Sequence, residues 1–190
     1  MNEPTEIEAQ NAVRVLLQYM GQDPEREGLA DTPRRVVAAW DELTRGYGQD
    51  PEQILGTAFE GDGYDQMIVC RGIDFWSMCE HHLLPFHGVA AVGYIPSERV
   101  VGLSKMPRLV KCFASRLQIQ ERLTKQVAEA MDSVLKPKGV GVLIRARHLC
   151  MACRGVRQQE AEMVTSSLLG EFRKQEVRAE FLNLVECQKI

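Results

Sequence analysis

The residues with the clearest chemical potential are two short clusters of cysteine and histidine. In Cys79-Glu80-His81-His82, the C-x-x-H spacing lets Cys79 and His82 reach one metal ion from a single turn. The second cluster, His148-Leu149-Cys150-Met151-Ala152-Cys153, adds an imidazole and two thiols at C-x-x-C spacing. Alone, the first cluster is equally typical of a buried cysteine beside a hydrogen-bonded histidine. Together, the two clusters favour a zinc site.

The number of ligands decides what such a zinc site could do. If Cys79, His82, Cys150 and Cys153 all bind, coordination is closed and the metal is structural. If only Cys79, His82 and Cys150 bind, a fourth position is open for a water molecule that zinc can deprotonate near neutral pH. The spacing leaves both schemes open. The adjacent His81 and His148 favour the open scheme because they suit proton transfer, although either could instead be a hydrogen-bond donor behind the ligands.

A second group of residues is basic and could converge on a polyanion. The sequence contains neither a P-loop nor a G-x-G-x-x-G motif, so any phosphate would be held by side chains. Taken singly, each cation is more typical of a solvated surface charge. Gln120-Glu121, between two apolar runs, is either a helix start or an amide and carboxylate pair that could read the polar edge of a purine. The candidates for anion binding are Arg35, Ser104, Lys105, Arg108 and Arg154.

The apolar spacing indicates which elements must position these side chains. Before residue 65 the spacing predicts helices over 5–20 and from Thr32-Pro33 onward, followed by a loop over 46–64. In the first helix we expect Ala9, Val13, Leu16, Leu17 and Met20 to form one apolar stripe.

From residue 65 onward, β-branched segments predict strands over 66–73 and 86–95, helical spacing returns over 103–135, and a strand is expected over 162–172. A terminal helix over 176–185 should bury Val177, Phe181, Leu184 and Val185. Alternation over 139–150 predicts a strand whose one face carries Val140, Val142, Ile144, Ala146, His148 and Cys150, so that His148 and Cys150 would point the same way. This order of elements favours an α+β fold with a largely antiparallel sheet.

Composition limits the classes of protein that fit. The 190 residues are 45% hydrophobic and 26% charged, with a net charge of −3, which is typical of a globular protein and provides no basic footprint for nucleic acid. We find no apolar run long enough for a membrane span and no secretory leader, so we expect a cytoplasmic protein. The six cysteines are then expected to be reduced, with Cys70, Cys112 and Cys187 packed as free thiols.

Four separated motifs resemble one enzyme family. They are Cys79-Glu80-His81-His82-Leu83-Leu84-Pro85-Phe86-His87-Gly88, then Gly102-Leu103-Ser104-Lys105, then Gln118-Ile119-Gln120-Glu121-Arg122-Leu123-Thr124, and finally His148-Leu149-Cys150 with Arg154-Gly155-Val156. In this order they are similar to GTP cyclohydrolase I, over a region from about Gly28 to the C-terminus. The resemblance implies a zinc (Zn2+) hydrolase that converts GTP and water to 7,8-dihydroneopterin triphosphate and formate, the entry step to folate and other pterins.

The resemblance also implies roles for individual residues. Cys79, His82 and Cys150 match the family's zinc ligands, and His81 and His148 match its proton-transfer histidines. Gln120 and Glu121 match the pair that recognises guanine. Cys153 stands where the family does not require cysteine, which supports the open scheme, and Ala38 stands where the family often has a lysine, which weakens the match around Arg35. The matches to the ribose triphosphate pocket are Ser104, Lys105, Arg108 and Arg154, with Arg35 as a more peripheral phosphate contact and Ser104 also suited to assist the ribose rearrangement.

The fold implied by the resemblance is the T-fold, or tunnelling fold. It has an antiparallel four-stranded sheet with paired helices, and we expect an N-terminal helical region over 1–64 and the T-fold catalytic domain over 65–190. The sheets of several subunits join into a barrel, in a decamer of two pentamers with active sites between subunits. Such closure would also remove the exposed sheet edges that invite uncontrolled pairing.

Three other functions compete with this one. A structural zinc module is opposed by the 71 residues that separate Cys79 from Cys150 and by the acidic net charge. A zinc-dependent nucleobase deaminase would use similar ligands, but its H-x-E and P-C-x-x-C signature is missing, and it would release ammonia and no formate. A relative of the same fold that acts on another pterin is the third alternative.

Overall fold

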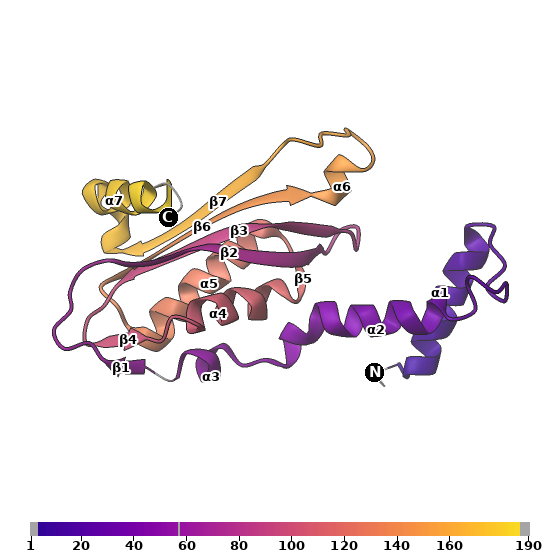
Figure 1. Cartoon of the computed structure of the whole chain (residues 1–190), viewed down its shortest axis with the longest axis horizontal. Helices are drawn as coiled ribbons and strands as arrows, with labels where there is room; N and C mark the ends of the chain where they lie inside the picture. Colours follow the sequence, from indigo (N-terminus) through magenta and orange to yellow (C-terminus); the bar gives the residue numbers. More distant parts are fainter. Residues whose placement is uncertain (1–3, 57, 187–190) are drawn as a thin grey trace. The chain divides into compact units, whose positions relative to one another are not determined.

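The computed structural model describes residues 4–56 and 58–186, which form two compact units divided between Arg45 and Gly46 (Figure 1). Cys187, which we expect to be a packed free thiol, lies outside the described residues. A short 3-10 helix, η1 (Arg45–Gly48), contains the division. The boundary predicted from the sequence, between a helical region over 1–64 and a catalytic domain over 65–190, is a functional division and stays a prediction. No described helix has the length and apolar character needed to cross a membrane.

The first unit is a pair of helices, α1 (Glu6–Tyr19) and α2 (Thr32–Thr44), as the apolar spacing predicts. Thr5 and Glu8 form a reciprocal capping box at the start of α1, which satisfies two backbone N–H groups that the helix leaves unpaired. Val13 and Leu17 are buried as expected, but the buried stripe on α1 is narrower than the predicted one. Leu16 and Met20 are exposed, because a unit of two helices buries only the narrow seam between them.

The second unit contains a mainly antiparallel sheet, which confirms the α+β fold class. The four predicted strands are β2 (Ile68–Cys79), β3 (Pro85–Ile95), β6 (Gly139–His148) and β7 (Met163–Gly170). A two-residue strand, β5 (Leu117–Gln118), pairs in parallel with the end of β2 and gives the order β5-β2-β3-β6-β7. The sheet therefore has five strands, one more than expected.

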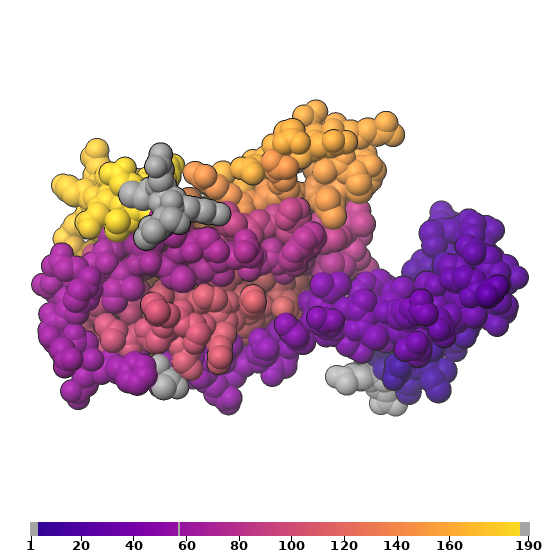
Figure 2. Space-filling model, in the orientation of Figure 1, coloured from indigo at the N-terminus to yellow at the C-terminus, as the bar shows by residue number. Residues whose placement is uncertain are grey.

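The alternation predicted for β6 separates two apolar clusters. Val140, Val142 and Ile144 belong to the main core beneath α4 (Lys105–Ala114) and α5 (Gln120–Leu135), whereas Leu143 on the other face packs with Phe172 and Phe181. Helix α7 (Gln175–Glu186) and the 3-10 helix η2 (Glu171–Arg173) supply those two phenylalanines, on the face of the sheet opposite α4 and α5 (Figure 1). Side chains of α4 lie directly against β2 (Figure 2).

Several short elements were not predicted. The segment expected to be a loop over 46–64 contains α3 (Pro51–Leu55) and β1 (Ala58–Glu60), which pairs with β4 (Arg99–Val101). Each is too short to produce a periodic sequence pattern. In α7, Phe181 is buried as expected and Val177 and Val185 pack beside it, but Leu184 lies outside this row and is exposed.

Candidate metal centre and active site

Three of the predicted ligands lie together at one end of the sheet. Cys79 is the last residue of β2, His82 lies in the turn that follows, and Cys150 belongs to the short helix α6 (Leu149–Ala152). Their ligand atoms all lie within 4.8 Å of one another, and the Cys79 Sγ to His82 Nδ1 distance is 3.7 Å. Elements far apart in the sequence thus deliver two sulfurs and one nitrogen to a single point.

The turn after β2 brings His82 back beside Cys79. The N–H groups of His82 and Leu83 both donate to the Cys79 carbonyl, at 3.3 and 2.9 Å, and the Cys79 N–H donates to the Leu84 carbonyl at 2.9 Å. Leu83 adopts a left-handed backbone conformation with φ of 50°. Since most residues avoid this region, the hydrogen bonds to Cys79 must hold the turn closed.

Cys150 reaches the group by a route that differs from the prediction. Strand β6 ends at His148, so the alternation that was expected to place His148 and Cys150 on one strand face does not extend to Cys150. The chain enters a single helical turn instead, and this turn directs Cys150 toward Cys79. Cys153 ends the same turn, is exposed, and is not among the three converging ligands.

The spacing of the three ligands fits a tetrahedral metal ion. With Zn–S near 2.3 Å and Zn–N near 2.0 Å, a sulfur and a nitrogen on one zinc ion lie about 3.5 Å apart, close to the 3.7 Å between Cys79 and His82. Burial and the neighbouring Cys79 thiol raise the pKa of Cys150, while the Arg154 cation opposes them. Because a metal binds the thiolate, metal binding here must displace a proton from a thiol that otherwise keeps it.

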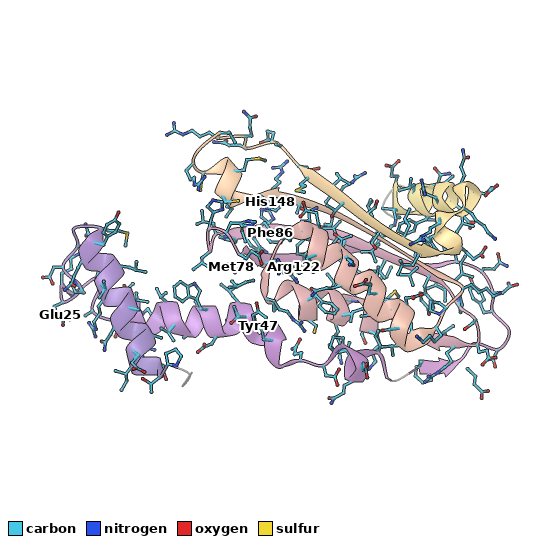
Figure 3. All side chains as sticks on the ribbon, turned by 180° about the vertical axis from the view of Figure 1, so that it is seen from behind. Glu25, Tyr47, Met78, Phe86, Arg122 and His148 are labelled. Atoms are coloured by element: carbon cyan, nitrogen blue, oxygen red, sulfur yellow. The ribbon has the colours of Figure 1, made fainter. Side chains whose placement is uncertain are left out.

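The two predicted proton-transfer histidines are close to ligand residues along the chain, His81 between Cys79 and His82 and His148 two residues before Cys150. His81 is exposed, and its Nδ1 lies 3.8 Å from Cys79 Sγ. His148 is half-buried, and its ring stacks on Phe86 with 4.6 Å between centroids and 5° between planes (Figure 3). Burial lowers the pKa of His148, and the nearby Glu121 carboxylate partly offsets this effect. His148 therefore favours the neutral imidazole that a proton-transfer group needs between steps.

Gln120 and Glu121 form the first turn of α5, next to His148. Glu121 is exposed, so its carboxylate is available to a ligand. Gln120 is only 1% exposed, and its side chain bonds within the protein, including a 2.8 Å contact between Oε1 and His148 Nε2. The two residues were predicted as one recognition pair, but they occupy different environments.

The predicted cations do not all join this cluster. Arg154 lies close enough to Cys150 to influence its pKa. Lys105 and Arg108 belong to the first turn of α4, which follows β4 in the chain. Strand β4 lies near the end of the sheet that is away from β5, because the Val101 N–H donates to the hydroxyl of Tyr94 in β3. Strand β2, which runs between the two ends, is about 35 Å long at 3.3 Å per residue. Figure 1 shows β4 and β5 at opposite ends of the sheet.

Ser104 and Arg35 belong to different compact units. Ser104 is the exposed residue before α4 and makes no side-chain hydrogen bond to cap that helix. Arg35 belongs to the first unit, where its guanidinium pairs with Asp31 at 3.2 Å. Within the described residues, neither Lys105, Arg108 nor Arg154 pairs with a carboxylate, so these three cations have no intramolecular neutralising partner.

Sequence reasoning missed an ion pair that connects the metal turn to α5. Glu80, between Cys79 and His81, pairs with Arg122, and the Glu80 N–H donates to the Gln118 carbonyl at 3.1 Å. Both residues belong to recognised motifs, Cys79-Glu80-His81-His82 and Gln120-Glu121-Arg122, and their opposite charges were the only available signal. Arg122 lies at the same end of the sheet as His148 and Phe86 (Figure 3).

Comparison with known proteins identifies close relatives along nearly the whole chain. A family model described as GTP cyclohydrolase I matches residues 9–186. The chain is 50% identical to GTP cyclohydrolase 1 of Wolinella succinogenes over 181 residues, which cover 95% of this chain and 97% of the relative. It is 54% identical to that of Nitrosospira multiformis over 176 residues, covering 92% of each chain.

The solved structure of an archaeosine synthase QueF-Like in the apo form is a more distant match. Its TM-score is 0.44 at 18% identity, covering 56% of this chain and 94% of that one.

Proposed function

The chain belongs to the GTP cyclohydrolase I family of enzymes, and on this premise we propose that it is a zinc hydrolase that converts GTP and water to 7,8-dihydroneopterin triphosphate and formate. The observation that carries the proposal is the convergence of Cys79, His82 and Cys150, with Cys153 outside their group and two histidines beside it. This arrangement supports a metal bound by three protein atoms and open to solvent at the fourth position. Folate and other pterins would be the end products of the pathway, and a cytoplasmic location is part of the proposal.

The chain's own residues would move protons around the guanine ring. Zinc, when bound, would supply the Lewis acidity that activates a water molecule near neutral pH. His148 would give a proton to a nitrogen of the five-membered ring and so make C8 electrophilic. His81, next to Cys79, would transfer protons as the bonds between C8 and nitrogen break and formate leaves.

Glu121 would provide the selection for guanine. Its exposed carboxylate can accept hydrogen bonds from guanine N1–H and the exocyclic amine. Adenine lacks these donors, so it would leave the carboxylate unpaired, a mismatch that can reduce turnover by several powers of ten.

The triphosphate would be held by cations from more than one subunit. Lys105 and Arg108 belong to the first turn of α4, whereas the last turn of this helix leads to β5, which pairs with Cys79. A second copy could bring its α4 start to the Cys79 end. Ser104 of that copy would then assist the ribose rearrangement, and Arg35 would be a more peripheral phosphate contact.

The edges of the sheet support an assembly of this kind. Within the described residues, β7 pairs on one side only, and β2 has β5 on its outer side only at Met78 and Cys79. Such long open edges favour pairing with another chain. We propose the T-fold arrangement, in which sheets of neighbouring subunits join into a barrel, with ten subunits in two stacked pentamers.

The direct test uses purified, metal-analysed protein with GTP. We expect equal amounts of formate and of a pterin that becomes fluorescent after oxidation. A chelator should abolish both products, zinc should restore them, and ATP should give neither. Ammonia release, or zinc-loaded protein that leaves GTP unchanged, would contradict the proposed function.

A further inference from the structure

The side chain of Gln120 is held in one orientation by backbone carbonyls. Its Nε2 lies 3.2 Å from the Ile144 carbonyl oxygen, 2.9 Å from that of Met163 and 3.1 Å from Thr165 Oγ1. The two carbonyls can only accept hydrogen bonds, so the amide must present its NH₂ group to them. The reversed amide would place Oε1 against two oxygens in a buried position, at a high electrostatic cost.

A chain of hydroxyl groups requires the same orientation independently. Thr124 Oγ1 donates its hydrogen to the Gln120 carbonyl at 2.7 Å, so in the 2.6 Å contact between the two threonines Thr165 must be the donor. With its own hydrogen used in this way, Thr165 Oγ1 can only accept from Gln120 Nε2. The donor and the acceptor of each hydrogen bond between α5 and β7 in this network are thus fixed.

The fixed amide in turn selects a tautomer of His148. Gln120 Oε1 lies 2.8 Å from His148 Nε2, and an amide oxygen has no hydrogen to give. The hydrogen of this contact must therefore belong to His148 Nε2. In the neutral ring, Nδ1 is then left without a hydrogen, and within the described part of the chain it has no hydrogen-bond partner. Stacking on Phe86 holds the ring in the plane that this hydrogen bond needs.

We propose that Gln120 is a positioning residue that fixes His148 as its Nε2–H tautomer, which leaves Nδ1 as the nitrogen that exchanges protons with the substrate. This inference rests on the proposed function, in which His148 protonates guanine. In that step Nδ1 first takes up a proton from solvent to give the imidazolium, the Nδ1–H bond then breaks as a new N–H bond forms on the base, and His148 returns to the neutral Nε2–H form. Gln120 would act through His148, and base selection would be left to Glu121.

The tautomer can be measured directly in the zinc-loaded protein. Solid-state NMR of ¹⁵N-histidine protein separates protonated from unprotonated ring nitrogens, and the chain has only four histidines. A His148→Asn variant assigns the relevant signals. We expect a protonated Nε2 and an unprotonated Nδ1 at His148. A wild-type His148 with the proton on Nδ1 would overturn the proposal without the need for any variant.

Kinetics of Gln120→Met then test the positioning role. We expect kcat to fall about 10- to 100-fold while KM for GTP changes less than about threefold, because the variant would lose correctly oriented acid catalysis and keep substrate binding. The His148 signals should become a mixture of tautomers. If Gln120→Met does not fold, Gln120→Asn, whose shorter side chain withdraws from His148, should give the same kinetic pattern.

Gln118→Met is the matched control. Gln118 is also 1% exposed, and its amide donates to the Phe113 carbonyl and to Gln126 Oε1, away from His148. We expect kcat within about twofold of wild type and an unchanged tautomer. Unchanged kcat in the Gln120 variants, a raised KM with normal kcat, or altered preference for GTP over ATP would overturn the proposal. A wild-type protein that converts no GTP would instead refute the proposed function, and the NMR result would still report on the tautomer.

Discussion

The two ends of the sheet in the second unit contrast sharply. At the β5 end, one chain gathers two thiols and an imidazole within 4.8 Å, and His148 and the Glu80–Arg122 pair lie beside them. At the β4 end, Lys105 and Arg108 stand at the start of α4 without any carboxylate partner among the described residues. The first end gathers three candidate metal ligands, whereas the second presents cations that pair with no carboxylate among the described residues.

The contrast follows from the distances that each kind of chemistry needs. A metal ion requires ligand atoms within a few ångström of one another, which a tight turn and a helical turn at the ends of neighbouring strands can supply. A triphosphate extends over several charged groups and can be bound by side chains that project from separate surfaces. We infer that metal binding is a property of one chain, whereas binding of the triphosphate depends on assembly.

The largest effect is expected when one of the three candidate metal ligands is removed. Cys150→Ser replaces a soft thiolate with a weak ligand, so we expect loss of stoichiometric zinc and a fall in turnover of about 10³-fold or more. Zinc content by elemental analysis and formate release measure the two effects. The matched control is Cys153→Ser, three residues further along the same helical turn, whose zinc content and turnover should both equal those of wild type. Equal losses in both variants would instead indicate four ligands and a closed structural site.

The second largest effect is expected when a cation at the start of α4 is removed. Arg108→Ala should lower kcat/KM for GTP by about 10- to 100-fold, since a charge-assisted hydrogen bond to phosphate contributes roughly 1.5–3 kcal/mol. Zinc content should stay at the wild-type level. Lys111→Ala on the same helix is the control, because Lys111 is an exposed cation one turn further along. If both variants fall equally, the effect comes from general charge and not from a phosphate contact.

Co-expression of the Cys150→Ser and Arg108→Ala chains tests whether each active site combines the metal ligands of one subunit with the cations of another. Oligomers mixed from Cys150→Ser chains and Arg108→Ala chains contain some sites with an intact ligand group from one chain and an intact Arg108 from its neighbour. Random mixing should restore about one quarter of the wild-type sites, because each shared site needs one particular combination of two chains. Activity no greater than the sum of the separate variants would place both ends of the site in a single chain.

The metal end was largely predictable from the sequence, because its residues are close together in short motifs. The spacings of Cys79 with His82 and of His148 with Cys150 indicated a shared ion, and family resemblance selected three ligands. The structural reason given for Cys150 was wrong, since periodicity cannot show where a strand ends and a helical turn begins. The hydrogen bonds of Gln120 were also beyond prediction, because Thr165 is 45 residues away and no local pattern connects them.

The cation end shows the opposite limit. Motif matching predicts Ser104, Lys105 and Arg108 as members of a family pattern, and this stays a prediction because a motif carries no information on distance. That α4 begins away from β5 and ends beside it follows from the pairing of β5 with β2, which emerges only when the fold is built. Short elements such as α3, β1 and β5 escaped prediction for a related reason, since their positions depend on tertiary pairing.

The smallest expected effect concerns the ion pair that connects the metal turn to α5. Glu80 and Arg122 are partly exposed, so Arg122→Met should lower the free energy of unfolding by at most about 1 kcal/mol. Because Glu80 lies between Cys79 and His81, a loosened turn should also weaken zinc binding and reduce turnover, by about three- to tenfold for a group that acts only by orienting ligands. Competition with a chromophoric chelator measures the zinc affinity.

The double variant Glu80→Gln with Arg122→Met tests whether the two residues act as a pair, since a true coupling requires the combined loss to be smaller than the sum of the single losses. Additive losses, or wild-type zinc affinity in Arg122→Met, would show that the pair is an ordinary surface contact and that the Cys79 turn is held by its backbone hydrogen bonds alone.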